Sequence, residues 1–542
     1  MTVEAVHRFA YRQGPGKSLF GGPIEIDDAA ATTALLPPLA ARGGLGAPLP
    51  HGTSELLGGA DHPHGRVGAH DPEDRAGHLL LAAFGLQRRE PSNRFNDHRP
   101  VASVRSKFPV HALTLSRHGA AYLDPYRHAL VDLDVPYAAL PTPRGDLDVV
   151  LAARYTDLPT PYGRLRAALG DLETGINLRS LLVAAELFGA RAELLLDSSE
   201  AAACARMVRA TGPGRWSAPV RVALRDVVPP AGGCPLPGGA AGPGAYGALD
   251  ALLADASAHP SLDEADEVAG HRLTAPAPRP EARAPGTRTG AVGVGGTGHA
   301  TGGDGTFPGG GPIACGIPGA PAGADAAAGR RDGTGGPPAP RWDRVLWNRT
   351  AGRVPGRLSG FSGRPTRLPE EALREAVAWT RVPPPAEALV EVGRRVRLLV
   401  ALQGVGDRHT GYHEVVDGEV RSVRREPRVM ALLQEAFGYP MSPGTDCGLR
   451  HASMAWTFAV DVRALLDDLG PVAWSLLNLW CGWTAHGLQL AAAARGLYAR
   501  PARSYDEFRV QRLAGLDRRT VPVFMTVCGR SRFAEPMLDL RT

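Results

Sequence analysis

Apolar runs divide the first half of the chain into strands and a helix. Residues 110–115 (VHALTL) alternate as a strand does, and residues 146–155 (DLDVVLAARY) form the apolar, β-rich run of a buried strand. Residues 178–189 (LRSLLVAAELFG) carry apolar side chains at helical spacing and end in glycine, as helices often do. Residues 220–228 (VRVALRDVV) indicate a further strand. The first half is therefore predicted to mix α and β structure.

The same order of elements returns in the second half. Residues 396–405 (VRLLVALQGV) and 452–462 (ASMAWTFAVDV) predict strands, and residues 521–530 (VPVFMTVCGR) predict a closing strand. Between them, residues 477–497 (LNLWCGWTAHGLQLAAAARGL) predict a long helix. Because this helix is apolar nearly all round, we expect it at the centre of its domain. The recurrence predicts that the chain is a duplication.

A segment rich in Gly, Pro and Ala separates the two halves. It has almost no large apolar side chains, so it cannot bury enough surface to offset its chain entropy, and we expect a flexible linker. The 542 residues are sufficient for two domains that each bury a core. We predict an N-terminal extension over residues 1–80, a first domain over 81–270, the linker over 271–340 and a second domain over 341–542.

Composition and charge exclude several classes of protein. The 60 basic residues exceed the 55 acidic residues only slightly and are spread along the chain, whereas a nucleic-acid groove needs a basic stripe with interleaved aromatics. The six cysteines show no Cys-x-x-Cys spacing, which argues against a disulfide framework and a zinc knuckle. No apolar run has the length of a membrane span or the form of a signal peptide. We therefore expect a soluble cytoplasmic protein without nucleic-acid or membrane partners.

Other motifs have ordinary structural interpretations. GPGKS (14–18) is not a phosphate-binding loop, because the pattern requires glycine where Tyr11 stands. His486, on the apolar helix, is interpreted as a satisfied core histidine. Four histidines in a loop rich in Gly, Pro and Asp are expected to be solvated, and no metal site is predicted: His62, His64, His70 and His78. Four tryptophans are expected to pack in the core or between domains: Trp347, Trp456, Trp480 and Trp483.

Two neighbouring segments carry a resemblance to a known family. Residues 99–115 (RPVASVRSKFPVHALTL) and 122–133 (YLDPYRHALVDL) resemble a segment of the SagB-type and thiopeptide-type azoline dehydrogenases, which are FMN-dependent nitroreductase-like proteins. In that segment an Arg precedes a Pro-Ser-Ala-Gly turn, and a strand leads to a Tyr-x-Tyr-(Asp)-Pro-x-x-His-x-Leu element. The matching positions are Arg99, Ser103, Pro109, Tyr122, Asp124 and His128.

Further segments extend the resemblance. Tyr162 matches the tyrosine of the family's Lys-Tyr-Gly segment, although Pro161 stands where that lysine is common. Residues 345–357 (VLWNRTAGRVPGR) are similar to the Arg-x-Ser-x-Arg helix start that grips the FMN phosphate, with Arg349 and Arg353 kept and Ala351 in place of serine. Two more positions depart from the family pattern, namely Ala168 where it has arginine and Ile176 where it has histidine.

These residue types suit flavin chemistry. Arg349 and Arg353, i and i+4 at a predicted helix start, would bind the phosphate with planar forks that stay charged. The turn at Ser103 would approach the flavin, and Arg99 would stabilise negative charge on its ring. Tyr162 would take the Cα proton of the substrate as a general base. Surface arginines, an ordinary loop and a packing tyrosine are the alternative interpretations.

The resemblance implies an α+β fold of two nitroreductase-like domains, with mixed and mainly antiparallel sheets flanked by helices. We expect the two to form a pseudo-dimer within one chain and to share a single composite FMN site. The implied activity is oxidation of thiazoline or oxazoline rings to azoles in a ribosomally synthesised peptide. The implied partners are the azoline-containing precursor peptide and a cyclodehydratase. An NAD(P)H-dependent flavin nitroreductase and a flavin-free peptide- or partner-binding scaffold remain as alternative functions.

Overall fold

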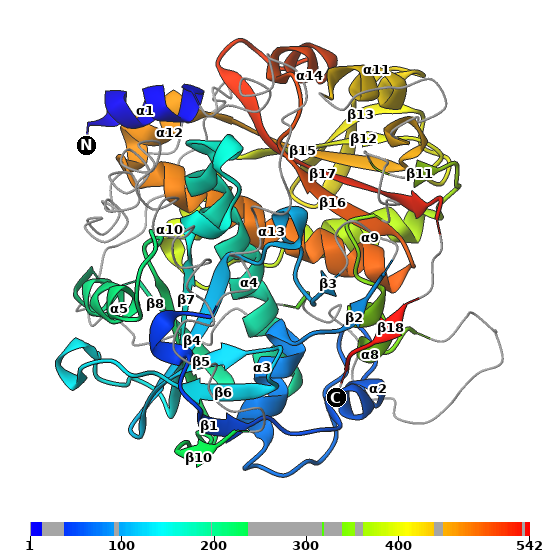
Figure 1. Cartoon of the computed structure of the whole chain (residues 1–542). Coiled ribbons are helices and arrows are strands. Elements are labelled where there is room, and N and C mark those ends of the chain that lie inside the picture. The colour runs from blue at the N-terminus through cyan, green and yellow to red at the C-terminus, as the bar shows by residue number, and fades with distance from the viewer. Residues whose placement is uncertain are drawn as a thin grey trace, which may run out of the picture.

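The computed structural model describes most of both halves of the chain. The described residues are 2–12, 37–91, 97–196, 198–236, 317–318, 339–352, 361, 363–437, 448–533 and 537–541. The predicted linker and the GPGKS motif thus fall almost wholly outside the described residues. Within the described part, two large sheets flank a pair of long central helices (Figure 1).

The first half forms an antiparallel sheet in the order β10-β1-β6-β5-β4-β7-β9-β8. Its strands are β1 (Leu45–Pro48), β4 (Val110–Ser116), β5 (Gly119–Asp124), β6 (Ala129–Asp132), β7 (Leu147–Ala153), β8 (Arg191–Leu195), β9 (Val220–Arg225) and β10 (Cys234–Pro235). Its helices are α2 (Thr53–Gly58), α3 (Arg75–Phe84), α4 (Leu165–Leu187) and α5 (Ser198–Ala210). β1 comes from the predicted N-terminal extension and pairs with β6 in this sheet.

The second half forms a sheet in the order β11-β17-β15-β12-β13-β14, with β16 also paired to β17. Its strands are β11 (Gly363–Arg364), β12 (Arg397–Leu402), β13 (Gly411–Val416), β14 (Glu419–Arg425), β15 (Met454–Asp461), β16 (Tyr498–Ala502) and β17 (Thr520–Ser531). Its helices are α8 (Trp342–Asn348), α9 (Glu370–Thr380), α10 (Glu387–Gly393), α11 (Val429–Ala436), α12 (Val462–Leu469), α13 (Ala473–Ala494) and α14 (Glu507–Leu513). α1 (Val3–Arg12) lies against α12.

Both halves have the same topology. The strand order β6-β5-β4-β7-β9-β8 of the first half corresponds to β14-β13-β12-β15-β17-β16 of the second. In both, the long central helix follows the fourth of these strands along the chain. The strands predicted from apolar runs are confirmed, and α13 is buried along nearly its whole length, as its all-round apolar pattern predicts. The duplication predicted from the sequence is thus present in the fold.

The central helices α4 and α13 pack directly against each other through a reciprocal pair of glycines. A Cβ added to Gly175 would lie 2.0 Å from the carbonyl oxygen of Leu479, and one added to Gly482 would lie 1.9 Å from that of Leu172. Gly175 and Gly482 each lie three residues after the leucine that the other glycine meets, as expected for two similar surfaces related by a two-fold axis. Figure 1 shows these two helices in the middle of the molecule. The chain therefore folds as an internal pseudo-dimer.

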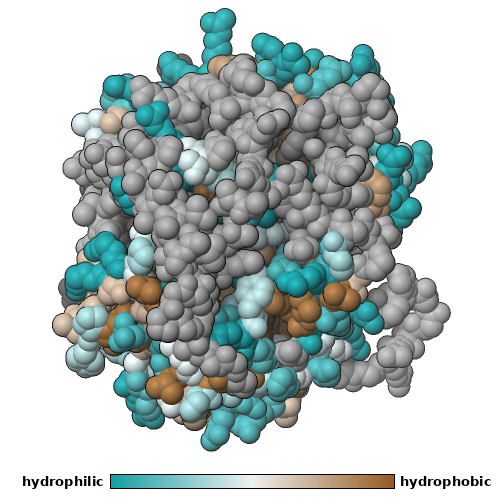
Figure 2. Space-filling view, in the orientation of Figure 1, coloured by the Kyte–Doolittle hydropathy of each residue, from teal (hydrophilic) through white to brown (hydrophobic). Residues whose placement is uncertain are grey.

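Other contacts tie the halves together. The buried Arg179 of α4 donates hydrogen bonds to the carbonyl oxygens of Trp483 (2.9 Å) and Trp379 (2.8 Å). A small sheet orders β18 (Leu538–Asp539), β2 (Arg88–Arg89) and β3 (Asp97–His98), so the end of the chain pairs with its first half. Figure 2 shows hydrophobic residues gathered in the lower half of the face, where Figure 1 draws β2 and β18.

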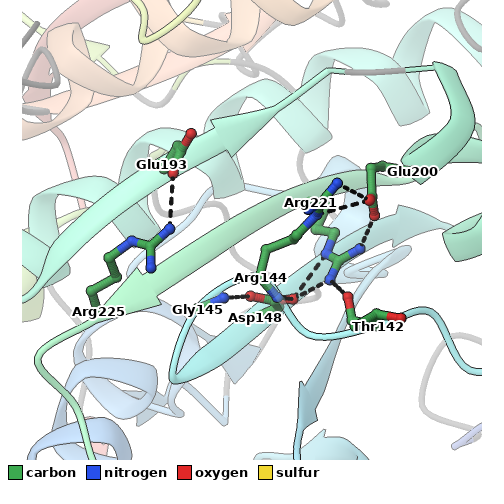
Figure 3. Close-up of polar contacts among 8 residues, drawn as sticks. All are labelled: Thr142, Arg144, Gly145, Asp148, Glu193, Glu200, Arg221 and Arg225. Carbon is green, nitrogen blue, oxygen red and sulfur yellow. Dashed lines mark hydrogen bonds and ion pairs between the residues drawn. The ribbon is translucent and has the colours of Figure 1, made fainter. Parts of the chain in front are cut away.

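A buried network of charges fixes α5 on the first sheet (Figure 3). Arg221 of β9 bonds to Asp148 of β7 through Nε at 2.9 Å, and its other nitrogens reach Asp148 and Glu200 of α5. Arg144 donates to Glu200 at 2.8 Å. Because Arg221 and Asp148 are essentially without solvent contact, their opposite charges must compensate each other there.

Two of the loop histidines that we expected to be solvated are buried. His62 stacks on Trp379, 5.7 Å between ring centroids, and contacts the edge of Trp342. His78 lies in α3 and hydrogen bonds to Thr53 Oγ1 at 2.9 Å. The loop composition gave no sign of these aromatic and hydroxyl partners, because they come from distant segments. Among the described residues, no group of three or more His, Cys, Asp or Glu side chains is arranged to hold a metal ion.

The predictions for His486 and for three of the four tryptophans are confirmed. His486 is buried and hydrogen bonds to Gln489 Oε1 at 3.2 Å. Trp456, Trp480 and Trp483 are buried in the core, whereas Trp347 is half-buried. None of the helices in the described ranges combines the length and apolar character needed to cross a bilayer.

Candidate functional site

Arg349 lies where the two halves meet, directly after the last residue of α8. Its Nε donates a hydrogen bond to the carbonyl oxygen of Arg99 at 3.0 Å. The prediction that Arg349 opens a helix is therefore wrong, because the apolar spacing of Trp342, Val345 and Leu346 drives a helix that ends before it. Arg353, the second predicted phosphate ligand, lies outside the described residues. The structure nevertheless brings together Arg99 of the first half and Arg349 of the second.

The surroundings of Arg349 carry an excess of positive charge. Burial lowers the pKa of Arg349 to about 9, and the neighbouring Arg88 lowers it as well, while Glu90 raises it. Arg88 donates to the carbonyl oxygens of Arg349 (3.3 Å) and Trp347, and its Nε bonds to Glu90 at 3.0 Å. Among the described residues, no carboxylate forms a hydrogen bond or ion pair with Arg349. Glu90 is thus bonded to Arg88 and acts on Arg349 only through its charge.

Arg99 is half-buried, and its guanidinium lies over two aromatic rings. Its Cζ lies 4.3 Å from the ring centroid of Phe108 and 5.6 Å from that of Tyr126. Its Nε is buried and has no hydrogen-bond partner among the described residues. A buried donor without a partner is costly, and a charged one more so. Together with Arg349, this unpartnered donor fits an anionic group such as the phosphate of FMN.

The turn that begins at Ser103 precedes β4 directly. Ser103 Oγ accepts a hydrogen bond from the backbone N–H of Phe108 at 2.7 Å. The N–H of Val104 donates to Glu173 Oε1, also at 2.7 Å. Ser103 is therefore placed within a few residues of Arg99, on the same loop, as the family spacing predicts. The structure adds a partner to the turn that we did not predict, the carboxyl group of Glu173.

Glu173 lies in the middle of α4 and is buried. Burial raises its pKa to about 8, although the hydrogen bonds from Val104 and Ser103 and the charge of Arg99 lower it. The carboxyl group thus holds a proton at neutral pH. The sequence around Glu173 (DLETG, 171–175) gives no sign that this side chain is buried. The contact that makes it part of the site comes from Val104, far away in the chain.

Tyr162 belongs to a short 3-10 helix, Thr160–Tyr162, just before α4, and its side chain packs against the main hydrophobic core. Its catalytic role stays a prediction.

A small pocket opens beside Arg99, where β4 and β5 separate. The two strands pair only from Leu113 to Ser116 of β4, which leaves a gap in the pairing before Leu113. His111 in this gap bonds through Nε2 to Asp157 at 2.8 Å, and burial lowers its pKa to about 4. The polar and aromatic lining residues are Arg99, Phe108, His111, Tyr122, Tyr126 and Asn177. The sequence analysis did not single out His111 or Asp157.

A larger cavity, of about 190 Å³, also borders Tyr126. It is bounded by residues of both halves, with Leu57, Leu81 and His128 from the first and Asp343 and Arg541 from the second. Its walls therefore mix apolar side chains with polar and charged ones. Tyr126 and Pro125 border this cavity and the small pocket alike.

Sequence comparisons place the chain in no known group. No protein-family model matches it. No curated protein matches it either.

Among solved structures, a putative nitroreductase from Anabaena variabilis is similar over the whole length. It is 14% identical in sequence, the match covers 98% of this chain and 100% of that one, and the TM-score is 0.59. An Escherichia coli microcin synthetase complex, McbBCD, with a truncated pro-peptide bound, matches over 30% of this chain and 64% of that one, at 13% identity and a TM-score of 0.26. A putative nitroreductase from Ralstonia eutropha matches over 38% and 89%, at 16% identity and a TM-score of 0.25.

Only the match to the Anabaena protein supports a conclusion, because the TM-scores of the other two are too low. It spans both halves of this chain at once, in agreement with the repeated strand order and the reciprocal glycines. The chain therefore has a nitroreductase-like fold, α+β in class, with two such domains in tandem.

Proposed function

We propose that this protein binds one FMN across its two halves and oxidises thiazoline or oxazoline rings to azoles in a ribosomally synthesised peptide. The observation that carries the proposal is the meeting of Arg99 and Arg349, two arginines from different halves. Arg349 is buried, Arg99 is half-buried with a buried Nε that has no hydrogen-bond partner, and neither forms an ion pair with a carboxylate among the described residues. A nitroreductase-like fold is the second support. The azoline substrate rests on the resemblance of residues 99–133 and Tyr162 to azoline dehydrogenases.

In this proposal the residues have separate roles. Arg349 and Arg353 bind the phosphate, Arg99 stabilises negative charge on the ring, and the turn at Ser103 approaches the cofactor. FMN, when bound, supplies the acceptor of a hydride and passes the electrons to oxygen. The azoline loses one hydride and the proton on Cα, which Tyr162 takes. The partners are the azoline-containing precursor peptide and a cyclodehydratase that makes the ring.

We expect a single flavin for each chain, because the two halves differ in the segment before β4 and β12, where the flavin ring would bind. In the first half the Ser103 turn leads into β4, whereas in the second half α10 occupies the corresponding position before β12. At this position, the described part of the second half therefore offers no loop of this kind for a second ring site. Absorbance of released flavin against protein concentration measures the ratio, and two flavins per chain would contradict the composite site.

The experiment that tests the function begins with the visible spectrum of the purified chain. We expect a flavin spectrum and, with an azoline peptide and oxygen, a loss of two mass units from the peptide without NAD(P)H. Bleaching by NAD(P)H with no peptide present would instead support a flavin nitroreductase. A colourless protein that does not take up added FMN would support a peptide- or partner-binding scaffold.

The role of Tyr162 has its own test. We expect Tyr162→Phe to lower the rate of azoline oxidation at least tenfold while the affinity for FMN stays within about threefold, since general-base catalysis contributes about 10²–10⁴-fold. Single-turnover measurements of azole formation separate the two quantities. An unchanged rate would assign the proton to another group.

A further inference from the structure

The turn after Ser103 has an unfavourable backbone. Arg105, Ser106 and Phe108 have φ angles of 51°, 53° and 45°, in the left-handed region that glycine tolerates and larger residues avoid. Each such residue costs about 1–2 kcal/mol, so three within four positions persist only where neighbouring contacts hold them. The contacts that hold this turn therefore decide whether its shape exists.

Those contacts converge on one side chain. Glu173 accepts the N–H of Val104 at 2.7 Å and hydrogen bonds with the side chain of Ser103. Ser103 in turn accepts the N–H of Phe108 at 2.7 Å. The carboxyl group of Glu173 thus anchors the start of the turn directly and its end through Ser103. Because Glu173 lies in the central helix α4, the anchor is rigid.

We propose that Glu173 is the positioning residue of the FMN site, and that its proton decides how the Ser103 turn presents itself to the flavin. The inference rests on the proposed function for its ligand. It extends that function by naming a residue that does not touch the reacting atoms but makes FMN binding depend on pH. The strained backbone and the two hydrogen bonds carry it.

Few charged groups act on the carboxyl group of Glu173 and could compensate its negative charge. Arg99 is the charged group that acts on it, and the amide of Asn177 donates to its backbone carbonyl oxygen at 2.8 Å. Titratable groups of the elements around α4 point to other partners: His78 of α3 to Thr53, His111 of β4 to Asp157, Asp148 of β7 to Arg221, and His486 of α13 to Gln489. Ionisation of Glu173 would therefore put a negative charge at the turn and oppose binding of the anionic, electron-rich cofactor.

The experiment compares Glu173→Gln and Glu173→Leu with the wild-type chain. Glu186→Gln, near the C-terminal end of α4, is the control. FMN affinity is measured by fluorescence at pH 7 and pH 9, and hydrogen exchange is measured by mass spectrometry on peptides covering residues 103–108. We expect the wild type to lose threefold or more in affinity between pH 7 and pH 9. Glu173→Gln loses this dependence, because its amide keeps the shape without a charge.

Glu173→Leu removes both acceptor oxygens. We expect it to bind FMN at least tenfold more weakly than the wild type and to exchange faster over residues 103–108, while Glu186→Gln behaves as the wild type. Wild-type exchange in Glu173→Leu over these residues, or equal wild-type affinity at pH 7 and pH 9, would overturn the inference and leave the FMN site standing. If the wild type binds no FMN at any pH, the proposed function fails, and the exchange measurement alone decides whether Glu173 holds the turn.

Discussion

At the scale of single residues, buried charge is the main feature of this protein. Arg349 is 3% exposed and has its pKa lowered to about 9, yet among the described residues it bonds only to a backbone carbonyl oxygen. A protein gains nothing in stability from such a residue, because its desolvation is not repaid. We therefore interpret it as a binding group whose partner is an anion.

A substitution at Arg349 tests this interpretation. Arg349→Met keeps the apolar length of the side chain and removes the charge, so we expect FMN affinity to fall at least tenfold while thermal stability is unchanged or higher. Titration of the apoprotein with FMN and a melting curve measure both. The control is Arg344→Met in α8, the helix just before Arg349, where the side chain is 70% exposed. Equal affinity in the two variants would argue against a phosphate site here.

The network in Figure 3 makes the opposite prediction, for stability. Arg221→Met leaves the buried Asp148 without its cation, so we expect unfolding free energy to fall by about 3 kcal/mol or more. Arg225→Met is the matched control on the same strand, because its ion pair with Glu193 is about half exposed and should cost no more than about 0.5 kcal/mol. Denaturant titration of both variants gives the comparison. Similar losses would mean that burial does not decide the strength of these pairs.

At the scale of elements, the two central helices depend on close approach of their backbones. Gly482→Ala inserts a methyl group where 1.9 Å is available to a backbone oxygen, so α4 and α13 must move apart. We expect a loss of about 1–3 kcal/mol, since overpacking outweighs the roughly 1 kcal/mol that alanine gains in helix propensity. The control Gly58→Ala in α2 meets its nearest atom at 3.7 Å and should be neutral or slightly stabilising. Melting temperatures decide between these outcomes, and a stabilised Gly482→Ala would mean that the helices can separate freely.

The elements also show which parts of the structure the sequence patterns could predict. β12, β15, β17 and α13 followed from apolar runs, because burial is the property that such runs record. The helix predicted over residues 178–189 is only the end of α4, which begins at Leu165. Its first part carries buried polar groups that interrupt the pattern, such as Asp171, which accepts from Ser475 at 2.7 Å.

The candidate site was predictable only in part, for the same reason. Family spacing was sufficient to single out Arg99, Ser103 and Arg349. It could not reveal Glu173 or the true position of Arg349 after α8, because both depend on partners far away in the chain. The spacing of residues along the chain reflects neighbours within one helix or turn. It gives no information on contacts between the two halves.

At the scale of the whole molecule, buried imidazoles predict sensitivity to acid. Burial lowers the pKa of His62 and His486 to about 3, and that of His98 and His111 to about 4, from 6.5. Between pH 6.5 and 4 the unfolded chain binds more protons at these sites than the folded chain, so stability present above 6.5 is lost as the pH falls. Glu173 acts in the opposite direction, with stability lost as the pH rises through about 8, but it is one group against four.

We therefore expect unfolding free energy to be clearly lower at pH 5 than at pH 7, by on the order of 2 kcal/mol for each imidazole that stays neutral. Denaturant titrations across this range measure the slope. His486→Gln should flatten it, because glutamine cannot take up the proton. Equal stability at pH 5 and pH 7 would show that the imidazoles find water or a counter-charge in the folded chain.

The reciprocal contact of Gly175 and Gly482 has a consequence for how such a protein can change over generations. In a dimer of identical subunits, every mutation appears twice, once on each side of the axis, and both active centres must tolerate it. After gene fusion the two copies can mutate independently, while the former subunit interface keeps them aligned. One copy can then replace its proposed flavin-binding loop with a helix, and the other can lose its phosphate-binding residues, provided that the two halves together still form one site.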